Sequence, residues 1–304
     1  MKTPPALEIK DKIGIIAPAR SISREELLPA IELFESWGLE VKLGEHIFHS
    51  FHQFAGKDEE RAADLQAFLD DPSIKAIVCA RGGYGTIKLM EHLNFEQFTK
   101  SPKWVIGYSD ITVLHSYITQ KLGVKTLHAT MPLNITSPAE DLPATELLKK
   151  VLFGEAIEYT WATSTKCDMP GTISGEVTGG NLSVLYSLRG TGFDIDTTGK
   201  ILFIEDLDEY LYHIDRMLMN FKHGNIFDGV KALLIGGMTD MNDNKTPYGL
   251  TAHEIINDIT KNYTFPVIFN FPAGHFKNNL PVIMGSELKI QKEGEEKMKA
   301  SFTL

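Results

Sequence analysis

Short apolar runs alternate with amphipathic segments through the first half of the chain, and this alternation constrains the fold most strongly. The runs KIGIIAPA, IKAIVCA and KWVIGY are apolar without polar alternation, and a segment with helical spacing follows each of them. Strands that are apolar on both faces belong to sheets covered on both sides, and helices usually connect parallel strands. The pattern therefore predicts an α/β fold with a parallel sheet between layers of helices.

The expected helices begin and end at recognisable residues. Ser23 stands where a cap is expected before REELLPAIELFESWG, and Gly38 follows that segment as a stop. The segment KDEERAADLQAFLDDP closes at Pro72, and DITVLHSYITQKLG ends at Gly123. We therefore expect strands and helices in alternation up to about residue 130.

The pattern changes around residue 135. The stretch NITSPAEDLPATELLKKVLFG indicates a connection followed by one helix, and β-rich segments begin at about Tyr159. Two further helices, YHIDRMLMNFKHG and TAHEIINDIT, separate strands that look buried. We predict an α/β N-terminal domain at 1–140, a linker at 141–170 and a β-rich C-terminal domain at 171–304.

Composition and charge exclude several classes of protein. The 304 residues are 43% hydrophobic and 23% charged, as expected of a globular chain with a substantial core. The net charge is −10 at pH 7. Because phosphate groups are bound by clustered Lys and Arg, this charge argues against nucleic acid and against an anionic membrane surface as partners.

The sequence shows neither a signal peptide nor a membrane span. The apolar stretch at 13–18 is too short for a signal peptide, and no run of about 18 apolar residues occurs. The two cysteines, Cys79 and Cys167, provide no CxxC metal spacing and no disulfide framework. A soluble cytoplasmic protein is the simplest interpretation.

Two loops at the ends of predicted strands are candidates for a site. RGGYG, at 81–85, follows the third strand, and GYSD, at 107–110, follows the fourth. Ligands of open α/β sheets bind at the carboxyl ends of the strands. If these strands are neighbours, both loops meet in one crevice.

Ser109 has two interpretations at the strand-to-helix turn. Ser109 or Asp110 could cap the following helix, which spacing alone favours. Alternatively, Ser109 is a nucleophile and the N–H of Asp110 faces a developing oxyanion. The G-x-S-x-G elbow of α/β-hydrolases is not present, because Ile111 stands where the second glycine would be. Asp110 could still cap the helix and free the Ser109 hydroxyl.

The glycine pair in RGGYG would let the backbone approach a ligand closely and offer N–H groups to an anion. The loop has neither the lysine of a P-loop nor the spacing of G-x-G-x-x-G. A plain turn is the alternative.

A nucleophilic serine needs a base and an acid that orients the base. His275 leaves a buried strand through FNFPAGH and could reach across a cleft, whereas His115 lies on the wrong side of the helix. Glu205 ends the apolar run ILFIE and could orient His275, while the acids after it, beginning with Asp206, are expected to face solvent. Structural roles remain the alternative for both Glu205 and His275.

A histidine cluster, HIFHSFH, could suggest a metal site. No carboxylate or cysteine joins His46, His49 and His52 at a convincing spacing. We interpret them as loop histidines and expect no metal.

Six motifs in order, GIIAPA, RGGYG, IGYSD, GEVTGGNLSVL, ILFIEDLDEYLYHIDRML and PAGH, resemble the LD-carboxypeptidase family of serine peptidases. The same family includes the microcin C self-immunity peptidases. The resemblance spans nearly the whole chain. It implies a flavodoxin-like N-terminal domain, a β-rich swivelling C-terminal domain, usually a homodimer, and cytoplasmic cell-wall recycling.

The resemblance also implies roles for individual residues. Ser109 would be the nucleophile, His275 the base and Glu205 the acid of a triad that needs no metal or cofactor. Gly83, with Gly82 as the alternative, and Asp110 would supply the oxyanion N–H groups. The substrate would be a murein tetrapeptide, cleaved at an L,D bond to release terminal D-alanine, and Arg81 is the candidate for its free carboxylate.

Two positions bear on the choice of substrate. Arg20 follows APA where a small residue is expected in the family, so it either alters that corner of the cleft or faces solvent. Trp161 could stack a nucleotide as in the microcin branch, although a single Trp in a β-rich segment is more often core. The chain length favours the murein branch.

Two other functions compete with the peptidase. A non-catalytic protein could bind an anion on RGGYG and the N–H of Asp110. It would be favoured if the side chains of Glu205 and His275 did not converge. An esterase or amidase with the same residues would differ only in its substrate.

Overall fold

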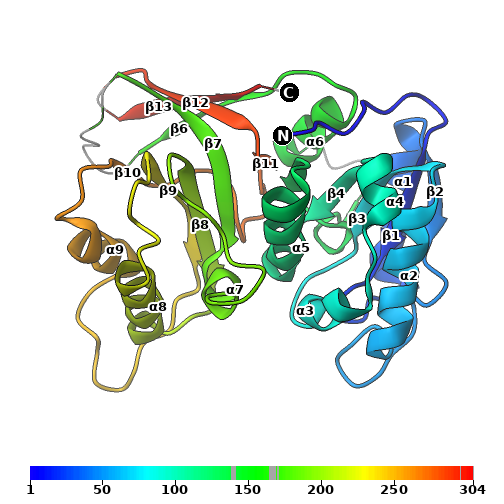
Figure 1. The fold of residues 1–304 in the computed structure, drawn as a ribbon, viewed down its shortest axis with the longest axis horizontal. Helices are drawn as coiled ribbons and strands as arrows, with labels where there is room; N and C mark the ends of the chain where they lie inside the picture. Colours follow the sequence, from blue (N-terminus) through cyan, green and yellow to red (C-terminus); the bar gives the residue numbers. More distant parts are fainter. Residues whose placement is uncertain (138–141, 164–168, 170, 295, 304) are drawn as a thin grey trace.

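The N-terminal half forms a parallel sheet with one antiparallel edge strand. In a computed structural model, which describes residues 1–137, 142–163, 169, 171–294 and 296–303, the strand order is β11-β5-β4-β3-β1-β2 (Figure 1). Strands β1 to β5 run parallel in the flavodoxin-like order 2-1-3-4-5, so the prediction for this half is confirmed. The six strands are β1 (Lys12–Ile16), β2 (Glu40–Leu43), β3 (Ile74–Cys79), β4 (Trp104–Gly107), β5 (Thr126–His128) and β11 (Val282–Met284).

Helices cover both faces of this sheet. Buried residues of α1 and α6 pack on one face, and those of α2, α4 and α5 pack on the other. The helix α4 was not predicted, because five residues are too few for apolar periodicity to be visible. The helices are α1 (Arg24–Ser36), α2 (Asp58–Asp70), α3 (Thr86–Leu89), α4 (Glu96–Lys100), α5 (Thr112–Tyr117) and α6 (Pro143–Leu152), with short turns η1 (Met90–His92), η2 (Ser109–Ile111), η3 (Ile118–Leu122) and η4 (Pro132–Asn134).

The start of α1 follows its sequence signal. The Glu26 N–H donates to Ser23 Oγ at 3.1 Å, and the Ser23 N–H donates to Glu26 Oε2 at 2.8 Å. This reciprocal pair satisfies N–H groups that have no partner inside the helix. The helix therefore begins directly after the loop that carries Arg20 and Ser21.

The second sheet combines a parallel and an antiparallel half, in the order β10-β9-β8-β7-β12-β13-β6. Strands β7 to β10 run parallel, whereas β12, β13 and β6 add an antiparallel ribbon to β7. The strands are β6 (Glu158–Ala162), β7 (Thr172–Asn181), β8 (Ile201–Leu207), β9 (Ala232–Thr239), β10 (Val267–Ile268), β12 (Glu287–Lys292) and β13 (Lys297–Phe302), and the helices are α7 (Leu182–Ser187), α8 (Leu211–His223) and α9 (Ala252–Thr260).

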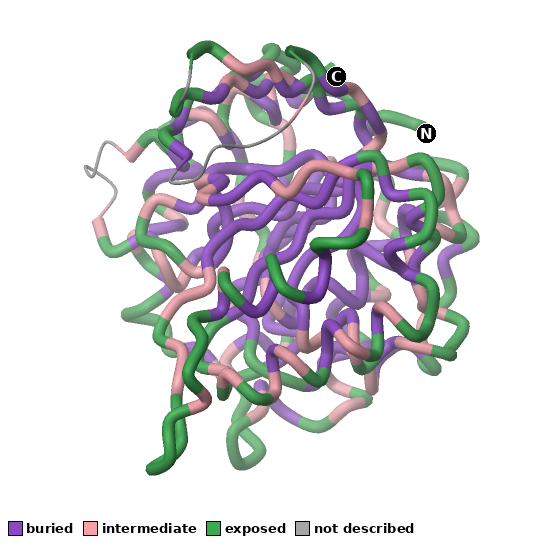
Figure 2. Tube along the Cα trace, turned by 90° about the vertical axis from the view of Figure 1, so that its left-hand side faces the viewer, coloured by how far each residue is buried: buried purple, intermediate pink, exposed green. Residues whose placement is uncertain are grey.

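The two halves share a hydrophobic core. One buried cluster runs from α1 through β1, β3 and β4 to β7, β8, β12 and β13, and Figure 2 shows this continuous buried interior. Strand β11 comes from the C-terminal half but pairs with β5 of the first sheet. Within the segment expected as a linker, α6 packs on the first sheet and β6 pairs with β13 of the second.

Helix α5 lies between the two sheets (Figure 1). Its first residue, Thr112, accepts a hydrogen bond through Oγ1 from the Asn181 N–H at 3.0 Å. A Cβ added to Gly180 would lie 2.6 Å from that oxygen, so only glycine lets β7 approach the helix this closely. The turn after β4 is thereby placed against the ends of β7 and β8.

A buried histidine without a polar partner makes stability depend on pH. His128 is fully buried against Tyr108 and Phe203, and neither ring nitrogen has a hydrogen-bond partner among the described residues. Burial, with the charges of His115 and His275, lowers the pKa of His128 well below its ordinary value. Its contribution to stability is therefore present above about pH 6.5 and is lost as the pH falls below that value.

We expect His128→Phe to reduce the loss of unfolding free energy between pH 7.5 and pH 5 by about 1–2 kcal/mol. Urea unfolding at the two pH values measures this difference. His223→Phe, at an exposed histidine on α8, is the control. If the unfolding free energy of His128→Phe fell between pH 7.5 and pH 5 as much as that of the unaltered protein, the buried ring would not resist protonation.

Candidate active site

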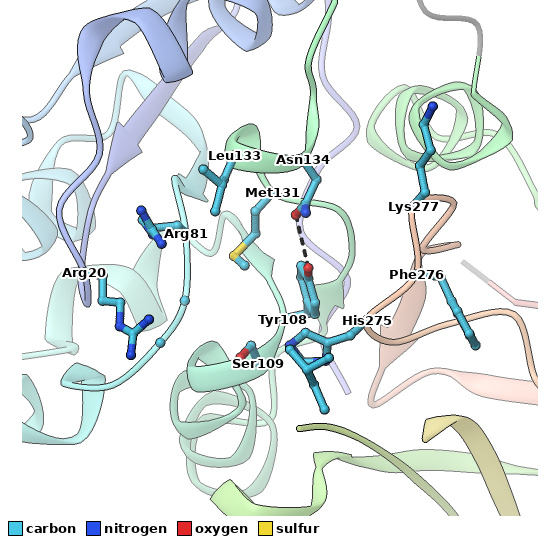
Figure 3. Close-up of a pocket in the computed structure, with 13 residues that line it drawn as sticks. Arg20, Arg81, Tyr108, Ser109, Met131, Leu133, Asn134, His275, Phe276 and Lys277 are labelled. Atoms are coloured by element: carbon cyan, nitrogen blue, oxygen red, sulfur yellow. Dashed lines mark hydrogen bonds between the residues drawn. The ribbon is translucent and has the colours of Figure 1, made fainter. Parts of the chain in front are cut away.

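A pocket of about 420 Å³ opens where the two halves of the chain meet (Figure 3). One wall comes from the RGGYG loop and Arg20, and the opposite wall comes from the loop that follows β10. Ser109 lies at the base between them. The lining residues are Arg20, Arg81, Gly82, Gly83, Tyr108, Ser109, Met131, Leu133, Asn134, Leu207, His275, Phe276 and Lys277.

Ser109 has a strained backbone. Its φ of 63° lies in the left-handed region, which a non-glycine residue rarely adopts and which occurs preferentially at functional sites. No side chain caps η2 or α5, so the helix-cap interpretation of Ser109 is wrong. Within the described residues, its hydroxyl forms no hydrogen bond and faces the pocket.

Asp110 fixes the turn from behind the pocket. Its buried carboxylate accepts hydrogen bonds from the Thr86 N–H at 2.8 Å and from Thr86 Oγ1 at 2.7 Å. Burial raises the pKa of Asp110, although both bonds from Thr86 oppose that rise. The side chain therefore holds the start of α3, not of its own helix as the sequence suggested.

The two glycines of the upstream loop separate Ser109 from Arg20. A Cβ added to Gly82 would lie 3.1 Å from Ser109 Oγ and 3.4 Å from the Asp110 nitrogen. Gly83 has φ of 118°, and its added Cβ would lie 2.7 Å from Arg20 Cδ. The glycine backbone thus reaches the serine, and both Gly82 and Gly83 lie beside the pocket.

Glu205 and His275 meet across the second half of the chain. His275 Nδ1 lies 2.6 Å from Glu205 Oε2, and Glu205 is fully buried at the end of β8. Gly274 has φ of 121°, and an added Cβ would lie 2.9 Å from Glu205 Cβ. Glycine before the histidine is therefore required for this approach. With Nδ1 engaged, Nε2 is the nitrogen left for the pocket.

The His275 ring packs against the residue next to Ser109. Its centroid lies 4.8 Å from that of Tyr108 in an edge-to-face arrangement. The Tyr108 hydroxyl donates to Asn134 Oδ1 at 3.1 Å, and burial raises the pKa of Tyr108 to about 12. Sequence analysis did not single out Tyr108 or Asn134. The position of Tyr108 beside the serine was the available signal.

The charge state of His275 reflects two opposing influences. Burial lowers its pKa, whereas the hydrogen bond and charge of Glu205, helped by Asp206, raise it, and the net effect is upward. Asp206 was expected to face solvent, but it is 2% exposed. It accepts hydrogen bonds from Asn181 Nδ2 and the Ser183 N–H, both at 2.9 Å. Burial, with the Glu205 charge, raises the pKa of Asp206 to about 7.

The other histidines are engaged elsewhere. His46 Nδ1 lies 2.8 Å from Asp64 Oδ1, and His49 Nδ1 lies 3.1 Å from Glu60 Oε1, both carboxylates being on α2. His115 is buried with both ring nitrogens hydrogen-bonded, and burial lowers its pKa to about 4. No group of three potential metal ligands occurs in the described part of the chain.

Three residues discussed for substrate recognition differ in how they are held. Arg81 Nη1 donates to the Ser21 carbonyl at 3.0 Å, so its guanidinium is partly tied to the structure. Arg20 lines the pocket and its side chain is exposed. Trp161 is buried and donates through Nε1 to the Phe269 carbonyl at 3.1 Å, so it belongs to the core. Cys167 lies outside the described residues.

Comparison with known proteins identifies the family of this chain. Residues 13–129 match the LD-carboxypeptidase N-terminal domain, and residues 174–290 match the LD-carboxypeptidase C-terminal domain. A probable murein peptide carboxypeptidase of Bacillus subtilis is 38% identical over 93% of this chain and 90% of that protein. The chain belongs to the LD-carboxypeptidase family. It is therefore a hydrolase of the serine type.

Solved LD-carboxypeptidase structures have the same fold. The crystal structure of muramoyltetrapeptide carboxypeptidase from Oxalobacter formigenes matches with a TM-score of 0.86 at 27% identity, over 96% of this chain and 99% of that chain. A microcin C7 self-immunity protein matches with a TM-score of 0.85 at 22% identity, over 98% and 97% of the two chains. The second likeness shows the fold alone. No helix of the described chain is long and apolar enough to cross a membrane.

We expect Glu205→Gln to move the acidic limb of the kcat/KM pH profile to lower pH. Glu205 raises the pKa of His275, and its removal leaves burial, which lowers that pKa. A base with a lower pKa stays neutral at lower pH. The plateau should fall by about 10³–10⁴-fold, because the uncharged amide no longer stabilises the imidazolium.

Asp206→Asn is the matched control for this measurement. Asp206 contributes less than Glu205 to the raised pKa of His275. The acidic limb of the kcat/KM profile should therefore move less in Asp206→Asn than in Glu205→Gln. A limb that stays in place or moves upward in Glu205→Gln would mean that His275 is not the titrating base.

Proposed function

We propose that this chain is a murein tetrapeptide LD-carboxypeptidase that uses Ser109, His275 and Glu205 to release terminal D-alanine. The 2.6 Å contact between buried Glu205 and His275, at the pocket that holds strained Ser109, carries the proposal. Family membership and the murein substrates in the names of its relatives support the choice of substrate. The convergence of Glu205 and His275 favours an enzyme over a non-catalytic anion binder.

In the first half of the reaction, His275 Nε2 takes the proton of the Ser109 hydroxyl as the oxygen attacks the scissile carbonyl. The tetrahedral oxyanion is stabilised by the N–H groups of Asp110 and Gly83, each of which contributes on the order of 3 kcal/mol in such sites. Gly82, which lies nearest the serine, brings the loop into position. Glu205 stabilises the imidazolium that forms.

In the second half, His275 donates its proton to the leaving nitrogen, and D-alanine departs. A water then attacks the acyl-enzyme with His275 again as the base, and Ser109 is regenerated. In the structure the Ser109 hydroxyl and the His275 ring face one pocket, and no hydrogen bond joins these two described residues. Such bonds often tighten only when substrate binds.

Recognition of the free terminal carboxylate of the substrate distinguishes a carboxypeptidase from other acyl-transfer enzymes. Arg81 is our candidate for this group, because it lines the pocket beside the glycine loop and a guanidinium binds carboxylate well. Its bond to Ser21 holds the guanidinium in a fixed orientation while leaving other N–H groups to donate. We also propose a cytoplasmic homodimer that needs neither metal nor cofactor.

We expect Ser109→Ala to lower kcat for an L,D-tetrapeptide by about 10⁴–10⁶-fold while the fold survives, because the nucleophile is lost. Mass spectrometry of murein tri-, tetra- and pentapeptides, and of an aminoacyl-nucleotide mimic, follows the products. Ser116→Ala on α5 is the control, since this buried hydroxyl has no partner in the described structure.

Full activity in folded Ser109→Ala would disprove the proposed nucleophile. Cleavage of the nucleotide mimic in place of the tetrapeptide would assign the chain to the microcin type of chemistry. Exhaustive treatment with a chelator should leave activity intact. Its complete loss would instead implicate a metal.

A further inference from the structure

A buried arginine stands at the end of the glycine loop, outside the pocket. Arg61 belongs to α2, which lies beside α3 (Figure 1), and only 1% of the residue is exposed. A charge in such a place is costly unless it is well hydrogen-bonded. The proposed triad gives this cation no role, so its contacts are the guide to what it does.

The guanidinium bonds to two partners at once. Arg61 Nη1 donates to the Pro18 carbonyl, in the segment that follows β1. Arg61 Nη2 donates to Asp58 Oδ1, in the first turn of α2. A planar guanidinium can hold two such partners in fixed directions, which a lysine or an apolar side chain cannot do.

The segment that begins at Pro18 touches the glycine loop. The Arg20 N–H points to the Gly82 carbonyl at 3.5 Å, and the Ser21 carbonyl accepts a hydrogen bond from Arg81 Nη1 at 3.0 Å. Arg20 and Arg81 both line the pocket. The bond from Arg61 to Pro18 therefore anchors the segment against which the first half of the loop rests.

The same guanidinium packs against the other end of the loop. Gly85 has φ of 132°, and a Cβ added there would lie 2.7 Å from Arg61 Nη1. The Phe54 ring confines the guanidinium, with its centroid 5.0 Å from Arg61 Cζ. Thr86, the residue after Gly85, donates both hydrogen bonds to Asp110. Arg61 thus fixes the point at which the loop enters α3.

The charge of Arg61 also acts on Asp110. This carboxylate is buried beside the proposed nucleophile, and burial raises its pKa. The hydrogen bonds from Thr86 and the charge of Arg61 oppose that rise. A charged carboxylate accepts stronger hydrogen bonds than a neutral one, so the cation strengthens the contact that holds the turn after β4.

Stability alone is a poor explanation for Arg61. Its Nε has no hydrogen-bond partner within the described part of the chain, and its ionic partner Asp58 has a side chain that is 34% exposed. Ion pairs that water screens contribute little, and apolar side chains of similar volume often replace buried ion pairs without loss of stability. The arrangement is better explained by the loops that it holds.

We propose that Arg61 is a positioning residue that holds the two proposed oxyanion donors, the N–H groups of Gly83 and Asp110, in the orientation that the reaction needs. It acts on the loop through Pro18 and Gly85, and on Asp110 through its charge. The inference rests on the proposed function and deepens it. Because these N–H groups meet negative charge only in the transition state, their displacement lowers kcat more than it raises KM.

The first test measures kcat and KM for an L,D-tetrapeptide in two variants. In Arg61→Met, which loses the charge and both hydrogen bonds, kcat should fall by about tenfold to a hundredfold while KM stays nearly unchanged. In Arg61→Lys, which keeps the charge but not the fork, kcat should fall by a smaller factor. Unchanged kcat in folded Arg61→Met would overturn the proposal.

Lys103→Met is the matched control, because Lys103 is a second buried cation at the opposite end of α2. It is 1% exposed, and its Nζ donates to the Phe68 and Asp71 carbonyls, both at 2.7 Å. This variant should unfold at lower urea concentration yet keep its kcat at temperatures where it is folded. Equal losses of kcat in Lys103→Met and Arg61→Met would mean that any damage to α2 lowers activity, and the proposal would be wrong.

A second measurement separates the oxyanion from substrate binding. The probe is a peptide that ends in a boronic acid at the scissile carbonyl, since a boronate on the serine carries a tetrahedral negative charge. Arg61→Met should weaken binding of this probe by the same factor as kcat/KM. In a Ser109→Ala background, Arg61→Met should leave the Kd of the intact tetrapeptide nearly unchanged. Equal weakening of both ligands would assign Arg61 to the general shape of the pocket and overturn its proposed role.

The outcomes distinguish this inference from the proposed function. If the unaltered protein hydrolyses no L,D-tetrapeptide, the function itself is contradicted. If it hydrolyses the peptide and the Arg61 variants do so with the same kcat, only the role of Arg61 is overturned. Should Arg61→Met not fold, Arg61→Lys decides, because the proposal requires a loss of kcat when the fork is removed and the charge is kept.

Discussion

The buried charge at the end of β8 is the constraint on which the site depends. Glu205 has no exposure to water, and a carboxylate in such a place is costly unless it is hydrogen-bonded. His275 Nδ1 lies 2.6 Å from it, and the ring becomes its positive partner when it takes up a proton. Because each side chain needs the other, the loop after β10 is held against the end of β8. The histidine is thereby delivered to the pocket in one orientation.

Asp206, the residue after Glu205, connects the same part of β8 to the other half of the molecule through hydrogen bonds. Asp206 accepts hydrogen bonds from Asn181 and from the start of α7. Asn181 in turn donates its backbone N–H to Thr112, three residues after Ser109. A short chain of hydrogen bonds from β8 to α5 thus sets the distance between the Glu205–His275 pair and Ser109, which belong to different halves of the molecule. It has little freedom, because Gly180 leaves no space beside Thr112.

Much of this arrangement could be predicted from the sequence, for physical reasons. Apolar runs without alternation are visible in a one-dimensional pattern, so the parallel strands of the first sheet could be predicted. Their flavodoxin-like arrangement was implied only by the family resemblance. The glycines beside Ser109 and His275 were visible too, since close backbone approach requires them. Spacing alone still favoured a cap for Ser109, and family resemblance reversed that preference. By contrast, Thr86, which bonds Asp110, and Asn181 and Ser183, which bond Asp206, lie 23 to 25 residues away along the chain. Local patterns carry no information about such contacts.

The strain at Ser109 follows from the same long-range contacts. A non-glycine residue with φ of 63° costs of order 1–3 kcal/mol, which the local sequence cannot recover. Asp110, the next residue, forms two hydrogen bonds to Thr86, and bonds to a charged group contribute about 1.5–3 kcal/mol each. The carboxylate therefore stabilises the turn that the serine alone would avoid. In this way the side chain expected to cap a helix instead holds the proposed nucleophile above the sheet, with its hydroxyl free to face the pocket.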